Sequence, residues 1–329
     1  MNTPPLLALH GIHKHFGPRP DWLERLGMRL GWLPPPARVH ALDGVDVEIT
    51  AGEVLGLVGE SGSGKSTLGR VAAGLLRPDQ GRRLWHGEEI AAAPMAAHGI
   101  QMVFQDPSAS LNPRMRVAEL IAEAPRTHGL IARREQADYV AGLLRRVGLA
   151  PGAASRFPHQ ISGGQLARIG IARALAVKPE LLICDEPVAA LDVSVQAQVL
   201  NLFGELRDRL GLTYLFISHD LGVVRHLCER VAILYLGRIV ESAPADELFT
   251  SPAHPYTQAL IADAPTLKAG KKRFVAIRGE LPSPLSPPSG CHFHPRCPHA
   301  FARCREERPV LRETAPGHRA ACHLHDASL

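Results

Sequence analysis

The stretch GESGSGKST, residues 59–67, decides the fold class. It fits the pattern G-x-x-x-x-G-K-[ST] and stands between the apolar run VLGLVG and a segment that favours a helix from about Lys65 to Leu76. Glycines let the backbone wrap closely around phosphate oxygens, which successive N–H groups and the start of the helix can then bind. We expect Lys65 to reach the β- and γ-phosphates of a nucleotide and the Ser66 hydroxyl to ligate Mg²⁺. The whole loop comprises Gly59, Glu60, Ser61, Gly62, Ser63, Gly64, Lys65, Ser66 and Thr67.

A second candidate element is the stretch LLICDEP, residues 181–187. Four apolar residues are typical of a buried central strand, and two carboxylates follow at its carboxyl end. We expect Asp185 to hold Mg²⁺ through water and Glu186 to accept a proton from the water that attacks the γ-phosphate. Acidic residues after strands are common, so this assignment depends on the phosphate loop.

The chain around these motifs alternates between strand-like and helix-like segments. A helix is expected over residues 194–210, and residues 115–178 favour helices that are interrupted at RFPHQISGG. This order is typical of an α/β core with a largely parallel sheet and an inserted helical subdomain. Apolar runs predict strands at residues 6–12, 45–58, 100–104, 181–185, 213–218 and 230–237.

An irregular insert, GPRPDWLERLGMRLGWLPPPAR, occupies residues 17–38. Its Trp and Leu residues favour a short amphipathic helix. Such a helix either packs locally, against nearby parts of the same chain, or contacts a partner protein. We expect local packing.

Composition excludes several classes of protein. Apolar residues make up 45% and charged residues 21% of the 329, which is ordinary for a globular chain, and no apolar run reaches the length needed to span a bilayer. The N-terminus lacks the pattern of an export signal, so we expect the chain in the cytosol. Residues 266–329 carry eleven Lys and Arg against five Asp and Glu. This basic tail can meet nucleic acid, anionic lipid or an acidic partner, but a solvated surface is the commoner explanation.

The stretch ISGGQLARIGIARAL, residues 161–175, makes the chain resemble an ABC-cassette ATPase, because few other proteins combine it with the two motifs above. Ser162, Gly163, Gly164 and Gln165 match the signature of that family. In the family, the signature faces the phosphate loop of the opposite subunit. The resemblance therefore implies ATP and Mg²⁺ as ligands, hydrolysis of ATP, and two cassettes that close on the nucleotide.

Further residues match family elements in the expected order. Gln105 in VFQDP resembles the glutamine that links Mg²⁺ and the attacking water to the helical subdomain. ALD at residues 190–192 resembles the D-loop, and His219 in FISHD resembles the switch histidine that contacts the γ-phosphate. Phe16 is the best aromatic candidate for stacking on adenine.

Longer stretches resemble the ATP-binding subunits of oligopeptide and dipeptide importers: QDPSASLNPRM, DEPVAALDVSVQAQVLNL, SPAHPYTQAL and LPSPLSPPSGCHFHPRCP. The stretch LNPRM and the insert after Phe16 favour the F-type ATPase subunit of such importers. Ala189 and the pair Leu166-Ala167 depart from the usual family residues, which puts details of the dimer interface in doubt.

The resemblance also implies an organisation. We expect a P-loop NTPase with a RecA-like core, an antiparallel β subdomain and an inserted helical subdomain at about 106–178, together forming an ABC domain over residues 1–265. A proline-rich linker at 266–290 and a Cys-rich extension at 291–329 follow. The implied partners are a second ABC ATPase, expected to be a paralogous D-type chain, two membrane permease subunits and, indirectly, a substrate-binding protein. The implied location is peripheral, on the cytoplasmic face of the inner membrane, with no nucleic acid involved.

Cys291, Cys297, Cys304 and Cys322 follow the spacing C-x5-C-x6-C-x17-C. Disulfides are rare in a reducing cytosol, where such clusters more often bind metal, and four thiolates suit either Zn²⁺ or a [4Fe–4S] cluster. The lack of C-x2-C pairs counts against the common zinc ribbons. Some ATPases of the peptide-importer family carry a cubane cluster here, so the resemblance favours iron and sulfur, with zinc and no metal as alternatives.

Other residues bear on the same question. Cys184 and Cys228 lie in apolar contexts and are expected to be core residues. Mixed ligation of zinc by nitrogen and sulfur stays open, because histidines accompany the cysteines at positions 292, 294, 299 and 323.

The sequence thus predicts an ATPase subunit that energises import of dipeptides or oligopeptides. Import of nickel or glutathione is the alternative within the same class. From a different class, an ABC protein that acts on nucleic acid or the ribosome would use the basic tail, but such proteins generally carry two cassettes in one chain or a long coiled-coil insert. A degenerate regulatory cassette is disfavoured by the intact Lys65, Glu186 and His219.

Overall fold

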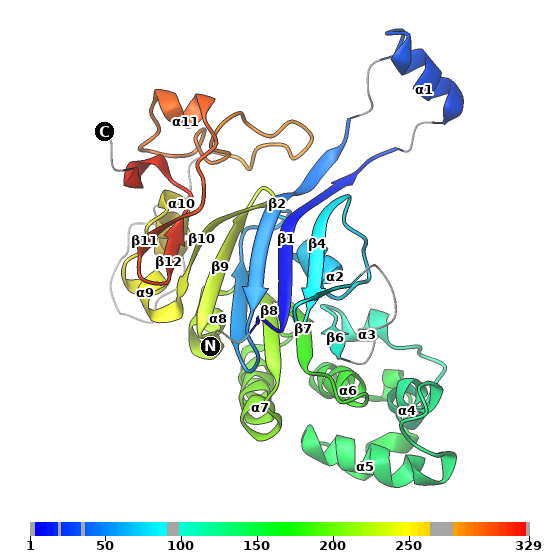
Figure 1. The fold of residues 1–329 in the computed structure, drawn as a ribbon. Coiled ribbons are helices and arrows are strands. Elements are labelled where there is room, and N and C mark those ends of the chain that lie inside the picture. Colours follow the sequence, from blue (N-terminus) through cyan, green and yellow to red (C-terminus); the bar gives the residue numbers. More distant parts are fainter. Residues whose placement is uncertain (1–3, 19–20, 34–36, 91–98, 264–278, 327–329) are drawn as a thin grey trace.

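The chain, seen in a computed structural model, is built on two β-sheets flanked by helices (Figure 1). The structure describes residues 4–18, 21–33, 37–90, 99–263 and 279–326. The larger sheet has eight strands, in the order β11 (Arg312–Ala315), β12 (His318–Ala320), β10 (Arg238–Pro244), β9 (Arg230–Tyr235), β3 (Val54–Val58), β8 (Thr213–Ser218), β7 (Leu181–Asp185) and β6 (Ile100–Val103).

The centre of this sheet is parallel, as the sequence predicts. Strands β9, β3, β8, β7 and β6 pair in parallel, and their residues are almost all buried. Along β7, Leu181 and Ile183 face one apolar core while Leu182 and Cys184 face the other. A strand covered on both faces needs an unbroken apolar run, which is why LLICD carries no alternation.

The smaller sheet is antiparallel and covers one face of the larger one. Its order is β2 (Val39–Ile49), β1 (Leu7–Phe16), β4 (Gln80–Trp85) and β5 (Glu88–Glu89). The predicted strand over residues 45–58 is in fact two strands in different sheets. They are separated by a turn in which Glu53 accepts hydrogen bonds from the backbone N–H and the hydroxyl of Thr50.

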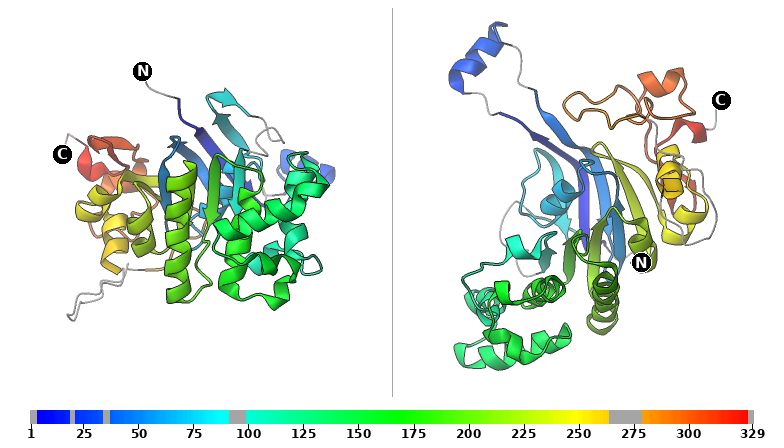
Figure 2. Two further views of the ribbon diagram at one scale, coloured as in Figure 1. Left: turned by 90° about the horizontal axis from the view of Figure 1, so that it is seen from below. Right: turned by 180° about the vertical axis from the view of Figure 1, so that it is seen from behind.

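Helices pack on both faces of the larger sheet. The helix after the phosphate loop, α2 (Lys65–Ala72), packs in the core between the two sheets, whereas α7 (Val193–Leu210) and α8 (Leu221–Leu227) pack on the opposite face of the parallel strands. The region at 106–178 is helical, as predicted, and its green helices lie at the end of the molecule away from the C-terminal extension (Figure 2). It contains α3 (Pro107–Ser110), α4 (Val117–Thr127), α5 (Gln136–Arg146) and α6 (Gly163–Leu175).

The insert forms the predicted amphipathic helix, α1 (Trp22–Arg29), but the prediction of local packing is wrong. The helix stands away from both sheets at the tip of the β1–β2 hairpin (Figures 1 and 2). Trp22 is 72% exposed and Trp32, just beyond the helix, is 78% exposed. Within the described ranges, the apolar side chains around α1 therefore face solvent rather than a core.

The C-terminal part fastens onto the larger sheet. It contains α9 (Ala245–Thr250), α10 (Pro255–Asp263), α11 (Ala302–Glu306) and the β11–β12 hairpin, which pairs with β10 through Glu241↔Ala320 and Ser242↔Arg319. Much of the expected linker at 266–290, namely residues 264–278, lies outside the described residues. Within the described ranges, no helix is both long enough and apolar enough to cross a membrane.

Candidate active site

The phosphate loop lies between β3 and α2, at the carboxyl end of the central strands. Gly64 adopts a φ of 108°, in the left-handed region that favours glycine. A Cβ placed on Gly64 would lie 2.3 Å from the Ala41 oxygen, and one placed on Gly59 would lie 2.2 Å from the Leu234 oxygen. Both glycines are therefore required by close approach of neighbouring backbone.

The interior of the loop suits an anionic ligand. Nζ of Lys65 donates to the carbonyl oxygens of Gly59 at 2.7 Å and Glu60 at 2.9 Å. Burial lowers the pKa of Lys65, while the negative charges of Glu186, Asp185 and Glu60 oppose that shift. The Ser63 hydroxyl is buried and has no hydrogen-bond partner within the described chain. A free hydroxyl and a cationic amine within one loop fit a phosphate.

The metal-binding candidates are adjacent. The Ser66 hydroxyl donates to Oδ1 of Asp185 at 2.9 Å, which brings the first residue after the loop lysine against the end of β7. Burial raises the pKa of Asp185, and the neighbouring Glu186 raises it further, whereas the hydrogen bond from Ser66 and the charges of Arg70 and Lys65 lower it. Hydroxyl and carboxylate oxygens are the kind of ligand that Mg²⁺ prefers, so these two residues fit the predicted role.

Two of the predicted catalytic residues approach one oxygen atom of the third. Oε2 of Glu186 accepts a hydrogen bond from Nε2 of Gln105 at 3.1 Å and lies 3.3 Å from Nδ1 of His219. Glu186 has a φ of 47°, an uncommon backbone conformation for a residue with a side chain, and its N–H donates to the Ile217 oxygen at 3.0 Å. The uncommon backbone conformation of Glu186 and its two partners are what the predicted catalytic role would require, and this role stays a prediction.

The signature residues start helix α6. Ser162 is the residue before the helix, and its N–H donates to Oε1 of Gln165 at 3.4 Å. Ser162 and Gly163 are exposed, whereas a Cβ on Gly164 would lie 2.3 Å from Cγ1 of Val195. Among the described residues, no hydrogen bond or ion pair joins this turn to the phosphate loop, so the chain presents its signature outward.

The predicted adenine contact, Phe16, is the last residue of β1 and is 43% exposed. It pairs across to Val39 of β2, two residues from Ala41, whose oxygen approaches Gly64. Nζ of Lys14 lies 5.7 Å from the centre of its ring. An exposed ring near the phosphate loop is consistent with a stacking surface, and this role stays a prediction.

The four tail cysteines line one small cavity together with His254, His294, His299 and His323. Burial raises the pKa of Cys322 to about 11, and the charges of the other three thiols add to the shift, which reflects how near they are. Yet within the described residues no three His, Cys, Asp or Glu side chains are spaced as metal ligands. Cys184 and Cys228 are buried core residues, as expected.

Two residues at the phosphate loop were missed by the sequence analysis. Arg296 lies between two of the cysteines, and both of its terminal nitrogens donate to the carboxylate of Glu60, at 2.7 and 3.0 Å. The Tyr256 hydroxyl accepts the N–H of Glu60 at 2.9 Å. Neither residue belongs to a phosphate-binding pattern. The signal available in the sequence was that the stretches containing them, SPAHPYTQAL and GCHFHPRCP, resemble those of peptide-importer ATPases.

Comparison with known proteins places this site in a family. Residues 42–189 match the ABC transporter family, and residues 240–304 match the family described as "Oligopeptide/dipeptide transporter, C-terminal region". The chain is 48% identical to the oligopeptide transport ATP-binding protein AppF of Bacillus subtilis, covering 98% of each chain. It is also 48% identical to OppF of Salmonella typhimurium, covering 96% of this chain and 95% of that one.

A solved structure has the same fold. The dimeric ATP-binding cassette MJ0796, in a post-hydrolysis state with ADP and phosphate, superposes with a TM-score of 0.61 at 25% identity, covering 73% of this chain and 98% of that one. The predicted α/β cassette fold is thereby confirmed. The chain belongs to the ABC transporter ATPases, in the group that carries the oligopeptide/dipeptide transporter C-terminal region.

Proposed function

We propose that this chain hydrolyses ATP to energise an importer of dipeptides or oligopeptides. The observation that carries the catalytic part is the convergence of Gln105 and His219 on Glu186, next to the contact of Ser66 with Asp185. The relatives named for oligopeptide transport, and the matching C-terminal region, support peptides over nickel or glutathione.

In this proposal each residue has a separate task. The loop amides and Lys65 bind the phosphates, and Lys65 leaves its carbonyl partners to do so. Ser66 and Gln105, with Asp185 through water, would hold Mg²⁺, which neutralises charge on the phosphate oxygens. Glu186 accepts the proton of the attacking water, and His219 contacts the γ-phosphate. Positioning and electrostatics supply most of the rate.

A second cassette completes the site. The signature turn at Ser162–Gln165 is largely exposed at the start of α6, where backbone N–H groups suit a phosphate bound to another subunit. We propose a paralogous D-type ATPase as that partner, with two permease subunits on the membrane and a substrate-binding protein acting through them. The chain would then sit at the cytoplasmic face of the inner membrane.

The four cysteines of the extension are proposed to hold a structural [4Fe–4S] cluster, with Zn²⁺ as the alternative. Support comes from the donor set, since four thiols line one cavity. Support comes also from His254, which lines the same cavity. Its Nδ1 accepts the N–H of Tyr256 at 3.0 Å, and its buried Nε2 has no partner within the described chain. A ring nitrogen left as a donor beside thiolates or sulfide fits such a centre.

The test is reconstitution. The chain would be combined with its permease subunits, the paralogous ATPase and the binding protein in liposomes, and ATP-dependent uptake of labelled dipeptides and oligopeptides measured. Uptake that disappears with Lys65→Ala in this subunit is expected. Uptake of nickel or glutathione in place of peptides would favour the alternative cargo. ATP hydrolysis without any association with the permease would contradict the transport function.

A further inference from the structure

The cysteine-rich extension reaches into the phosphate loop through one side chain. Arg296 is only 9% exposed, and its two terminal nitrogens bind the two carboxylate oxygens of Glu60 at 2.7 and 3.0 Å. This two-point geometry is the strongest kind of ion pair between these groups. Glu60 is the only acidic residue of the loop at 59–67. The tail and the loop therefore share a bond across 236 positions of sequence.

Glu60 is held through both its side chain and its backbone. Its carboxylate binds Arg296, and its N–H donates to the Tyr256 hydroxyl at 2.9 Å. Its carbonyl oxygen accepts from Nζ of Lys65 at 2.9 Å and from the N–H of Ser63 at 3.2 Å. When Lys65 turns to a phosphate, its bond to Glu60 is lost. Of the bonds that remain, those to Arg296 and Tyr256 tie this end of the loop to the C-terminal part of the chain.

The side chain of Arg296 is itself held by aromatic residues. Its guanidinium lies 5.9 Å from the ring centre of Tyr235 and donates to the Tyr235 hydroxyl at 3.4 Å. Tyr235 packs on Tyr256 at 4.6 Å and on Phe293 at 5.4 Å between ring centres, and all three are almost fully buried. Burial opposes the charge, but the hydrogen bonds to Glu60 and Tyr235 outweigh it and raise the pKa of Arg296.

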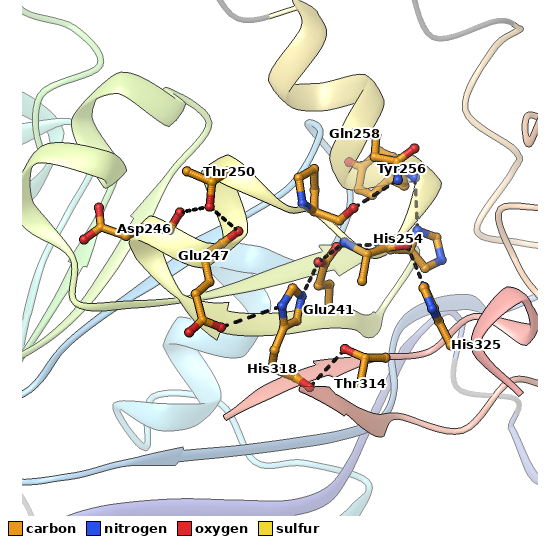
Figure 3. A network of polar contacts seen from close by, with 12 residues as sticks. Glu241, Asp246, Glu247, Thr250, His254, Tyr256, Gln258, Thr314, His318 and His325 are labelled. Carbon is orange, nitrogen blue, oxygen red and sulfur yellow. Dashed lines mark hydrogen bonds and ion pairs between the residues drawn. The ribbon is translucent and has the colours of Figure 1, made fainter. Parts of the chain in front are cut away.

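The extension is also fixed to the cassette. Glu241 of β10 accepts three hydrogen bonds: from the N–H of Ala253 at 2.6 Å, the N–H of His254 at 2.9 Å, and Nε2 of His318 at 2.7 Å. Figure 3 shows Glu241 between His254 and His318. Glu241 is fully buried. This network joins the tail hairpin, through His318, to the segment that carries Tyr256. The segment whose Tyr256 contacts Glu60 is thus hydrogen-bonded to β10, as is the tail hairpin.

We propose that Arg296 is a positioning residue of the nucleotide site: it neutralises Glu60 and ties the phosphate loop to the cysteine-rich extension. The proposal rests on the proposed function, because it takes residues 59–67 as the site of the ATP phosphates. Without Arg296, the Glu60 carboxylate, whose side chain is 24% exposed, has an unpaired negative charge on a loop that binds an anionic ligand. That charge repels the phosphates, and the loop loses an anchor when Lys65 turns away.

The test measures ATP affinity on the full chain with Arg296→Gln. Its dissociation constant for ATP is expected to rise about tenfold, with kcat in the assembled transporter changed by less than about twofold, since the reacting groups are untouched. Arg296→Lys keeps the charge and should recover part of the affinity. Arg305→Gln, at an exposed arginine of the same extension, is the matched control and should bind ATP like the wild type.

The same substitution is then made in a Glu60→Gln background. There it is expected to weaken ATP binding by less than about twofold, because the charge that Arg296 neutralises has already been removed. An equal loss in both backgrounds would show that Arg296 acts on overall structure and would overturn the proposal. Normal ATP affinity of Arg296→Gln would overturn it as well.

Two further measurements separate the possible failures. Lys65→Ala should lose ATP affinity in any case. If it does not, the assignment of the phosphate site is wrong, and with it the basis of this proposal. If Arg296→Gln does not fold, Glu60→Gln breaks the charged pair from the other side. Hydrogen exchange of the amides at 59–64 should then speed up severalfold while residues 291–326 keep wild-type exchange. Unchanged exchange of the loop would overturn the proposal.

Discussion

Gln105 donates a hydrogen bond of 3.1 Å to Glu186, although the two residues are 81 positions apart. Gln105 follows β6 and Glu186 follows β7, and these strands are parallel neighbours in the sheet. The carboxyl ends of these two strands therefore lie at the same edge of the sheet. There Gln105, which directly precedes the helical region at 106–178, contacts the carboxylate that we propose as the general base. A movement of the helical region would change this contact directly.

Replacing Glu186 with Gln should abolish turnover while leaving ATP bound. The amide cannot accept a proton, and loss of a general base typically costs about 10²–10⁴ in rate. Single-turnover hydrolysis and retention of labelled ATP by the assembled transporter measure the two effects. Hydrolysis at the wild-type rate would contradict the assignment of Glu186.

Gly59→Ala should lose ATP binding and destabilise the fold. The new methyl group would lie 2.2 Å from the Leu234 oxygen, so the loop or β9 must shift, at a cost of about 1–3 kcal/mol in the free energy of unfolding. Gly142→Ala in α5 is the matched control, since nothing lies within 4 Å of its Cβ position. That change should stabilise the helix by about 0.5–1 kcal/mol. Equal effects at both sites would refute the steric argument.

Acid should weaken the fold partly through Glu53. Burial raises the pKa of this carboxyl, but hydrogen bonds and the charge of Arg230 outweigh it, so the pKa lies below its ordinary value of 4.5. A lowered pKa in the folded state gives stability that is complete above the ordinary value and is lost as the pH falls through the lowered one. Urea unfolding at pH 7, 5 and 4 should show a smaller acid loss in Glu53→Gln than in wild type. Glu306→Gln, at an exposed site, should behave as wild type.

The helix α1 should add little to stability. Trp22 is 72% exposed, so Trp22→Ala should change the free energy of unfolding by no more than about 0.5 kcal/mol. Phe293, which is 2% exposed among the aromatic residues of the extension, should cost about 3–5 kcal/mol when replaced by Ala. Chemical denaturation compares the two. A large loss for Trp22→Ala would mean that α1 packs on the chain after all.

Metal analysis tests the cysteine cavity. Anaerobically purified protein should hold about four iron and four sulfide per chain and absorb visible light. Cys297→Ser should reduce both, whereas Cys228→Ser, in the core, should leave the iron content unchanged. One zinc without sulfide would favour the alternative metal, and absence of both would contradict a metal centre.

Local patterns explain which features could be predicted. Three segments were predicted correctly: the phosphate loop, LLICD and TYLFIS. Each is a pattern of consecutive residues that is compatible with one local structure. The boundary between β2 and β3 was missed because two apolar strands in different sheets read as one run. The exposure of Trp22 was missed because an amphipathic pattern states that a helix has an apolar face and not what covers it.

The contact of Arg296 with Glu60 was beyond sequence reasoning for a different reason. It depends on how a distant extension docks, and an arginine among cysteines carries no indication of its partner. The resemblance assigned the stretches around Glu60 and Arg296 to the same protein family, but it did not indicate that the two residues are in contact. Only the folded chain relates them.

The pairing of β12 with β10 has a consequence for how the tail is studied. Besides the two paired positions, the N–H of Ala321 donates to the Val240 oxygen at 2.8 Å, so the tail hairpin covers the outer border of the strand β10. A chain truncated before residue 312 would leave that border as a row of unsatisfied amides and carbonyls, the kind of edge along which proteins aggregate. Such a truncation removes Cys322 as well, so precipitation would combine the effect of a bare sheet edge with the loss of a proposed cluster ligand, and point substitutions are the cleaner means of studying this tail.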